Sequence, residues 1–313
     1  MYGNLWALFI ISLRALWRGW KKSGIKKTLE DVRMLRRLFP AKAIKIKKSG
    51  ALVISESGND MAAEIHGKEI TVYGSITIKN CVILLRDMTF NVEKVGQKIL
   101  SDGSLWIENT LFLGSMGHLS NLNIVSGGIV QGEISKVSMV YIRDGRYNGT
   151  ISEIEKWLHI SNSRGIVRGS VGRIGEVLYL DAGEFITDTL PSIEGGYAVL
   201  KEGKIMGTDG TPWPLEAIMG SIAPLTEDHE IFLFGSGGNV LLGAGAAHVL
   251  CKEGTDPYSR YKTENIISSN RFYRLIDGKI REVTLKSAPN QQIGAHANKF
   301  YSFVRLEIVD KTQ

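Results

Sequence analysis

Four acidic side chains have a spacing that fits a reaction, the paired-carboxylate chemistry of glycan cleavage. Glu155 and Glu176 fall near each other on consecutive repeats of the chain, and Asp181 and Glu202 form a second pair. Two carboxyl groups that flank one sugar bond can act as general acid and as base or nucleophile. Neither pair is accompanied by basic or aromatic residues in the same register. Exposed carboxylates that serve solubility are the commoner case, so we do not expect an enzyme.

Other chemistry has weaker support in the sequence. The six histidines show neither HExxH nor another metal-ligand spacing, so no metal site is expected. The run GSGGNVLLGAG, residues 235–245, superficially resembles a phosphate-binding loop. It lacks GK[ST] and a βαβ context, so we interpret its glycines as turn residues and predict no cofactor. Cys81 and Cys251 have no CxxC spacing and are expected to be isolated thiols.

The acidic residues lie on a repeat that runs from about His118 to Gly207. An apolar anchor recurs at separations of 18, 18, 20 and 20 residues, at Ile124, Ile142, Ile160, Leu180 and Leu200. Three further apolar columns follow each anchor: Ile129, Tyr147, Ile166, Phe185 and Ile205; Ile134, Ile151, Val171 and Leu190; and Val137, Ile154, Ile174 and Ile193. Such short units cannot bury an apolar face alone, so they must stack on their neighbours.

The repeat predicts a mainly β fold, a single-stranded right-handed parallel β-helix of about 17–20 residues per coil. An antiparallel β-sandwich is the alternative, because it also has short strands and regular turns. The apolar columns would point inward. Since side chains alternate along a strand, the residues just before the anchors would then point outward. Tyr141, His159 and Tyr179 are therefore predicted to form an exposed aromatic row, either a binding surface for a subunit or sugar ring or a stabilising ladder without a partner.

We expect three parts: a basic helical anchor in residues 1–40, the β-helix in 41–207 and a C-terminal antiparallel β cap in 208–313. Residues 84–103 do not fit the repeat and are expected to form an excursion from one coil. FYRLIDGKIREVTL near the C-terminus predicts a hairpin with an Asp-Gly turn.

The basic charge of the chain is concentrated at its N-terminus. Residues 1–50 carry a net charge of +11, whereas the whole chain carries +6, so the remaining residues carry 6 − 11 = −5 and are acidic. Residues 5–20 place apolar side chains at helical spacing with two arginines opposite, which predicts an amphipathic helix that meets lipid or protein. A second helix is predicted near residues 28–38 and carries three more arginines. No recognised nucleic-acid-binding motif accompanies them, so nucleic acid is not an expected partner. The predicted anchor comprises Trp6, Phe9, Leu13, Arg14, Trp17, Arg18, Trp20, Arg33, Arg36 and Arg37.

The repeat resembles two families, in periodicity rather than in any invariant motif. It resembles the right-handed β-helix of bacteriophage tailspikes and fibre-like receptor-binding proteins, whose N-terminal segments dock on the virion and whose trimeric β-helices project outward. It is also similar to the bactofilins, polymer-forming bacterial cytoskeletal proteins with tails that can bind membrane.

The first resemblance implies a non-enzymatic attachment protein of a virion tail or surface spike, a homotrimer docked on other virion proteins, with a host glycan or an anionic membrane surface as a further partner. The second implies a scaffold polymer at the bacterial cytoplasmic membrane surface. A glycan-cleaving enzyme is the third hypothesis.

Overall fold

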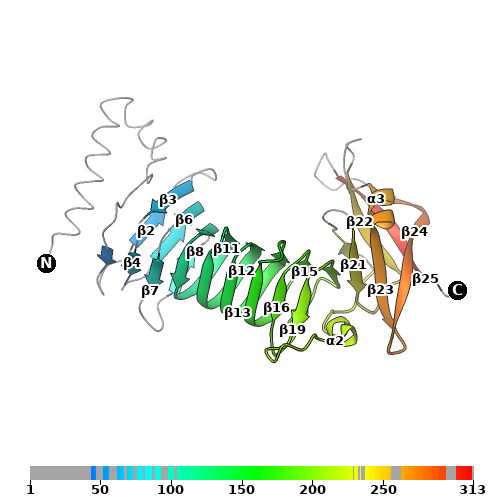
Figure 1. Cartoon of the computed structure of the whole chain (residues 1–313). Helices are drawn as coiled ribbons and strands as arrows, with labels where there is room; N and C mark the ends of the chain where they lie inside the picture. The colour runs from blue at the N-terminus through cyan, green and yellow to red at the C-terminus, as the bar shows by residue number, and fades with distance from the viewer. Residues whose placement is uncertain are drawn as a thin grey trace, which may run out of the picture. The chain divides into compact units, whose positions relative to one another are not determined.

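The computed structural model of the chain describes residues 104–227, 229–231, 233, 237–254, 262–293 and 301–311, together with eight short strands between residues 44 and 101. The chain forms a parallel β-solenoid of about eight turns, with antiparallel strands toward the C-terminus (Figure 1). This confirms the predicted parallel β-helix architecture. The chain divides into two compact units: the first unit is residues 1–137 with 143–149, and the second unit is residues 138–142 with 150–313.

Three parallel ladders build the first unit. One contains β1 (Ile44–Ile46), β4 (Glu69–Val72), β7 (Thr89–Val92), β10 (Leu111–Leu113) and β12 (Ile129–Arg143). The second contains β2 (Leu52–Ser55), β5 (Ile76–Lys79), β8 (Lys98–Ser101) and β11 (Ser115–Val125). The third contains β3 (Ala62–His66), β6 (Val82–Arg86), β9 (Ser104–Glu108) and again β11. Each coil thus contributes one strand to each ladder.

The prediction that residues 84–103 leave the solenoid is wrong. The segment contributes β7, β8 and part of β6, and these strands pair with earlier and later coils in all three ladders. Leu85 is the register partner of Ile107, a separation of 22 residues. This coil is longer than those that follow, and the extra residues hide the repeat.

The inward columns are mostly those predicted. Of the anchors, Ile124, Ile142, Ile160 and Leu180 are fully buried. The second column is corrected at two positions, where Val130 and Val167 are buried in place of the predicted Ile129 and Ile166. The separation between an anchor and the buried residue of the second column varies from five residues (Ile142 to Tyr147) to seven (Ile160 to Val167). A prediction that assumes a nearly constant separation therefore places this buried residue one position too early in two of the coils.

Glycines make one corner of the first unit. Gly114, Gly132 and Gly149 have φ values of 147°, 155° and 147°, a region that favours glycine. A Cβ atom at Gly132 would lie 1.8 Å from the carbonyl oxygen of Gly114, and one at Gly149 would lie 1.9 Å from that of Gly132. Each coil therefore turns where its backbone touches the backbone of the coil before it.

The second unit continues with parallel ladders. The second half of β13 (Arg146–Ile160) pairs with β15 (Val177–Leu180), which pairs with β18 (Tyr197–Leu200). β14 (Ile166–Ile174) pairs with both β16 (Glu184–Ile186) and β17 (Ser192–Ile193), and β16 pairs with β19 (Lys204–Met206). β19 is the last strand of these ladders.

A mixed sheet follows β18 without a break. β21 (Gly238–Leu242) pairs antiparallel with β18 and parallel with β23 (Asn270–Ile276). β24 (Lys279–Ile293), β25 (Tyr301–Asp310) and β22 (His248–Gly254) continue antiparallel (Figure 1). β20 (Glu230–Ile231) pairs parallel with β22. The predicted β cap is therefore present but mixed. Residues 238–242 of the glycine-rich run form β21.

The Asp-Gly hairpin is confirmed. Asp277 and Gly278 have φ values of 51° and 72° between β23 and β24, as a two-residue turn with positive φ at both positions requires. The described residues of the second unit also include two short helices, α2 (Leu215–Gly220) and α3 (Thr263–Ser269). Among the described residues, no helix is long and apolar enough to cross a membrane.

The last coil is closed on all three of its sides by chain that follows it. β21 covers the edge of β18 over four residue pairs, from Tyr197 with Leu242 to Leu200 with Asn239. On the other two sides, Ile222 bridges Ile193 and Pro212 bridges Met206. A covered strand edge has no row of unpaired N–H and C=O groups with which a strand of another molecule could pair.

Candidate functional site

The predicted aromatic row lies in the second unit, on the outward side of β13 and its neighbours. His159 is the register partner of Tyr179, which is the partner of Val199. The ring centroids of Tyr141 and His159 lie 5.3 Å apart in an edge-to-face arrangement, and those of His159 and Tyr179 lie 5.6 Å apart. The three rings are therefore adjacent, as the repeat predicts.

The prediction that all three rings are exposed needs a correction at Tyr179. Tyr141 and His159 are partly buried, but only 1% of Tyr179 is exposed. The register explains this burial, because the row continues beyond the solenoid: Val199 pairs with Val240, Val240 with Phe272 and Phe272 with Val283. The face of β15 and β18 that points away from the solenoid interior therefore continues into the face of β21 and β23 that packs against the core of the C-terminal sheet.

A second hydrophobic core forms on this outward side. β15 is buried at every residue, so its two faces pack against two different cores. Trp157 packs at the edge of the second core, and its ring centroid lies 6.2 Å from that of His159. The buried members of this core are Val177, Tyr179, Tyr197, Val199, Leu225, Ile231, Leu233, Val240, Leu242, Val249, Cys251, Ile266, Phe272, Val283, Leu285 and Leu306.

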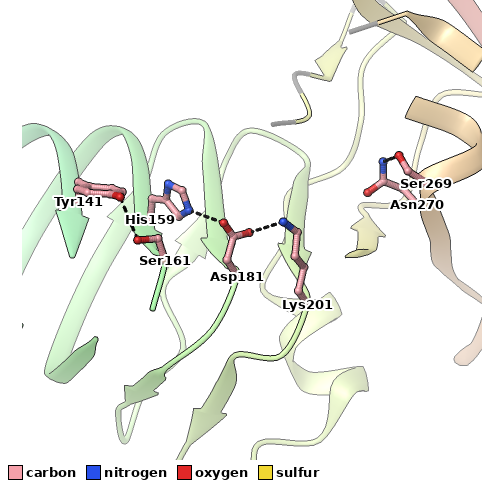
Figure 2. A network of polar contacts seen from close by, with 7 residues as sticks. All are labelled: Tyr141, His159, Ser161, Asp181, Lys201, Ser269 and Asn270. Atoms are coloured by element: carbon pink, nitrogen blue, oxygen red, sulfur yellow. Dashed lines mark hydrogen bonds and ion pairs between the residues drawn. The ribbon is translucent and has the colours of Figure 1, made fainter. Parts of the chain in front are cut away.

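Polar side chains line the border of the aromatic row (Figure 2). The Nε2 atom of His159 lies 2.9 Å from Oδ2 of Asp181, and Nζ of Lys201 lies 3.1 Å from Oδ1 of the same carboxylate. The hydroxyl of Ser161 donates to the hydroxyl of Tyr141 at 3.0 Å. The network therefore joins residues from successive coils of the solenoid, and Asp181 uses both of its carboxylate oxygens on neighbours.

The surroundings of Asp181 favour its charged form. Burial acts to raise the pKa of Asp181, but hydrogen bonds from His159 and Lys201, together with their charges, outweigh this and hold the pKa below its usual value of 3.8. The side chains of His159, Asp181 and Lys201 are 18%, 27% and 24% exposed. The Asp181 carboxylate is half-buried and contacts both His159 and Lys201, so it links side chains of successive coils.

Neither predicted acidic pair is set side by side by the register. Asp181 faces Lys201, whereas the exposed Glu202 follows one residue later. The backbone N–H of Glu176 donates to the carbonyl of Lys156, and Gly175 rather than Glu176 lies over Glu155. Glu155 and Glu176 are 21 residues apart in the sequence, whereas the register pairs residues 20 apart, as at Trp157 and Val177, so Glu176 is offset from Glu155 by one residue.

Glu176 has an electrostatic environment of its own. Partial burial raises the pKa of this carboxyl, the Lys156 ammonium acts to lower it and the Glu230 carboxylate raises it further. A raised carboxyl pKa is a feature of general acids, but it is also produced wherever two acids share a partly buried surface. Glu230 lies on β20, which joins the C-terminal sheet, so the interaction is between the solenoid and that sheet.

The sequence interpretation missed three residues of this network, namely Trp157, Ser161 and Lys201. Ser161, Asp181 and Lys201 each directly follow an anchor residue, as Tyr141, His159 and Tyr179 directly precede one. A column after the anchors was therefore visible in the repeat. In the first unit, Trp106 precedes the buried Ile107 in the same way and is 40% exposed.

The predicted anchor residues between Trp6 and Arg37 lie outside the described residues. The domain boundaries near residues 41 and 207 stay predictions. Comparison of the chain with family models, with curated proteins and with solved structures found no match. The candidate site therefore rests on the geometry above.

Proposed function

We propose that the chain is a non-enzymatic structural and attachment protein of a virion or surface appendage. In this proposal the β-solenoid is a stalk, the C-terminal sheet is its tip, and the basic residues 1–40 dock on other proteins of the particle. The protein would act as a homotrimer, with a host glycan or an anionic membrane surface as the target of attachment.

The observation that carries the proposal is the closed last coil. β21 occupies the edge of β18, and bridges at Ile222 and Pro212 occupy the other two sides. A filament grown by stacking solenoids end on end needs an open edge at each end, because head-to-tail contacts must repeat. The closed coil supports a discrete particle component over the alternative, a bactofilin-like polymer at the membrane.

The junction between stalk and tip is a second support. β18 belongs to the solenoid and pairs with β21 of the C-terminal sheet over four residue pairs. The two also share the core that contains Tyr179 and Phe272. A tip joined by a continuous sheet and a common core is held stiffly, which suits a stalk that presents a surface at its end.

The remaining alternative is a glycan-cleaving enzyme. A retaining mechanism needs two carboxyl groups about 5 Å apart and an inverting one needs them about 6.5–9.5 Å apart, facing the same bond. Asp181 is held by His159 and Lys201, and the register offsets Glu176 from Glu155. The geometry therefore supports attachment over cleavage.

The experiment is binding of the purified full chain to immobilised capsular and lipopolysaccharide glycans, with released reducing ends measured in parallel. The proposal expects binding without release. Release of sugar that is lost in Glu155→Gln or Glu176→Gln would overturn it in favour of the enzyme.

A further inference from the structure

Trp106 presents an aromatic ring on the outward side of the first unit. It is 40% exposed and is the one exposed large apolar side chain among the described residues. Its neighbours along β9, Leu105 and Ile107, are buried in the solenoid core. Because side chains alternate along a strand, the indole of Trp106 points away from that core.

The register surrounds Trp106 with small polar side chains. β9 and β11 pair Trp106 with Asn123, and the residues between the outward positions of both strands are buried. Register partners on parallel strands lie about 4.8 Å apart, so an amide lies beside the indole. Three register pairs make up this surface, which we call the Trp106 face: Ser104 with Asn121, Trp106 with Asn123, and Glu108 with Val125.

One polar atom beside the indole is not satisfied by the protein. The Nδ2 atom of Asn121 donates to Oγ of Ser104 at 2.7 Å, whereas Oδ1 of the same amide is buried and accepts no hydrogen bond. A buried acceptor without a donor is costly and calls for an explanation. A hydroxyl group of a ligand would satisfy this oxygen once the amide turns toward it, and side-chain changes of this kind are common on binding.

An equivalent ring elsewhere in the chain has a partner. Trp106 directly precedes the buried Ile107, as Tyr179 directly precedes the buried Leu180 in the second unit. Tyr179 is covered by the second hydrophobic core and is 1% exposed. An aromatic ring at this position of a coil therefore serves as a packing surface when another group lies over it.

The size and chemistry of the Trp106 face identify what fits it. A stable protein interface takes about 20–30 residues on each side, so six side chains on two strands suit a small ligand better than a second copy. Small-molecule sites combine an apolar surface with a few polar groups. Here the polar groups are two amides, a hydroxyl and the carboxylate of Glu108, which would repel an anionic group.

We propose that the Trp106 face binds an uncharged sugar residue of a glycan. The apolar C–H face of the sugar ring stacks on the indole, and the amides of Asn121 and Asn123 bond its hydroxyl groups. The inference rests on the proposed attachment function, since it names the site that holds the target glycan. It assigns this contact to the solenoid rather than to the C-terminal sheet.

An array of neutral, sialylated and sulfated oligosaccharides, probed with the full chain, tests the site, and titration calorimetry then measures the dissociation constant of each glycan that is bound. We expect a neutral glycan to bind and Trp106→Ala to weaken its binding by about tenfold or more, as for an aromatic anchor. Trp106→Phe keeps a ring and should lose much less. Arg168→Met, at an exposed position of β14, is the control and should bind as the wild type does. Circular dichroism checks that each variant is folded.

Several results would overturn the inference and leave attachment standing. These are equal binding of a neutral glycan by wild type and Trp106→Ala, loss of binding in Tyr141→Ala instead, and binding of only sialylated or sulfated glycans or of phosphatidylglycerol vesicles. A lower mass of Trp106→Ala in light scattering would assign the face to a second copy and overturn it as well. If the full chain binds neither a glycan nor vesicles, the inference and the attachment function fail together.

Discussion

The Nζ atom of Lys201 lies 3.1 Å from Oδ1 of Asp181, so the side chain that faces this carboxylate is a cation rather than the acid Glu202. The carboxylate is thereby held between Lys201 on one coil and His159 on another. This pairing favours contacts that join coils over the third hypothesis, in which two acids would face a substrate.

Replacement of Lys201 by methionine should therefore lower stability. Lys201→Met keeps most of the aliphatic stem but leaves Asp181 half-buried with one partner, which costs about 1–2 kcal/mol. Urea unfolding at pH 7 measures the difference. Arg168→Met, at an exposed position of β14, is the control and should change the free energy of unfolding by less than about 0.5 kcal/mol. Equal effects of the two substitutions would contradict a joining role for Lys201.

Acidic pH should remove the contribution of Asp181 to the free energy of unfolding. Because the pKa of this carboxyl is lowered in the folded state, its stabilising effect is fully present above its usual value of 3.8 and is lost as the pH falls through the lower, folded-state pKa. The difference in free energy of unfolding between wild type and Asp181→Asn should accordingly be largest near neutral pH and shrink between about pH 5 and 2. Urea titrations across that range measure it, and a difference that stays constant with pH would refute the assignment.

Tyr179 and Tyr141 give a matched test of the second core. Tyr179 is 1% exposed and belongs to that core, so Tyr179→Ala should cost about 3–5 kcal/mol. Tyr141 is only partly buried, and Tyr141→Ala should cost clearly less. Thermal and urea unfolding of both variants provides the comparison. If the two cost the same small amount, the row would be an exposed ladder after all.

The glycine corner predicts a severe effect from one methyl group. Gly132→Ala brings a Cβ atom to within 1.8 Å of the Gly114 carbonyl oxygen at a φ of 155°, so the coils must separate and about 3 kcal/mol or more should be lost. Gly220→Ala is the control, since nothing lies within 4 Å of its added Cβ. Circular dichroism melts of the two variants should differ widely. A Gly132→Ala protein with the wild-type melting temperature would show that the corner is not tightly packed.

The repeat predicted the inward columns because an alternating strand must bury one side, and Ile124, Ile142, Ile160 and Leu180 are fully buried as expected. It could not predict the burial of Tyr179. Alternation shows which side of a strand a residue is on, but not what packs against that side. Here the packing partners come from later in the chain, from Leu225 onward. The acidic pairs failed because the members of each pair are 21 residues apart in the sequence, whereas the register pairs residues 20 apart, as at Trp157 with Val177 and Leu180 with Leu200.

The claim at the centre of this account is that the closed last coil makes the protein a discrete particle component. Multi-angle light scattering of the full chain over a hundredfold range of concentration tests it most directly. The account predicts one mass at every concentration, because β21 occupies the edge of β18 and leaves no edge there for a further copy. The proposed homotrimer, which the resemblance to tailspikes implies, would give three times the mass of the chain. A mass that grows with concentration, with filaments visible by electron microscopy, would contradict it and favour the polymer-forming scaffold.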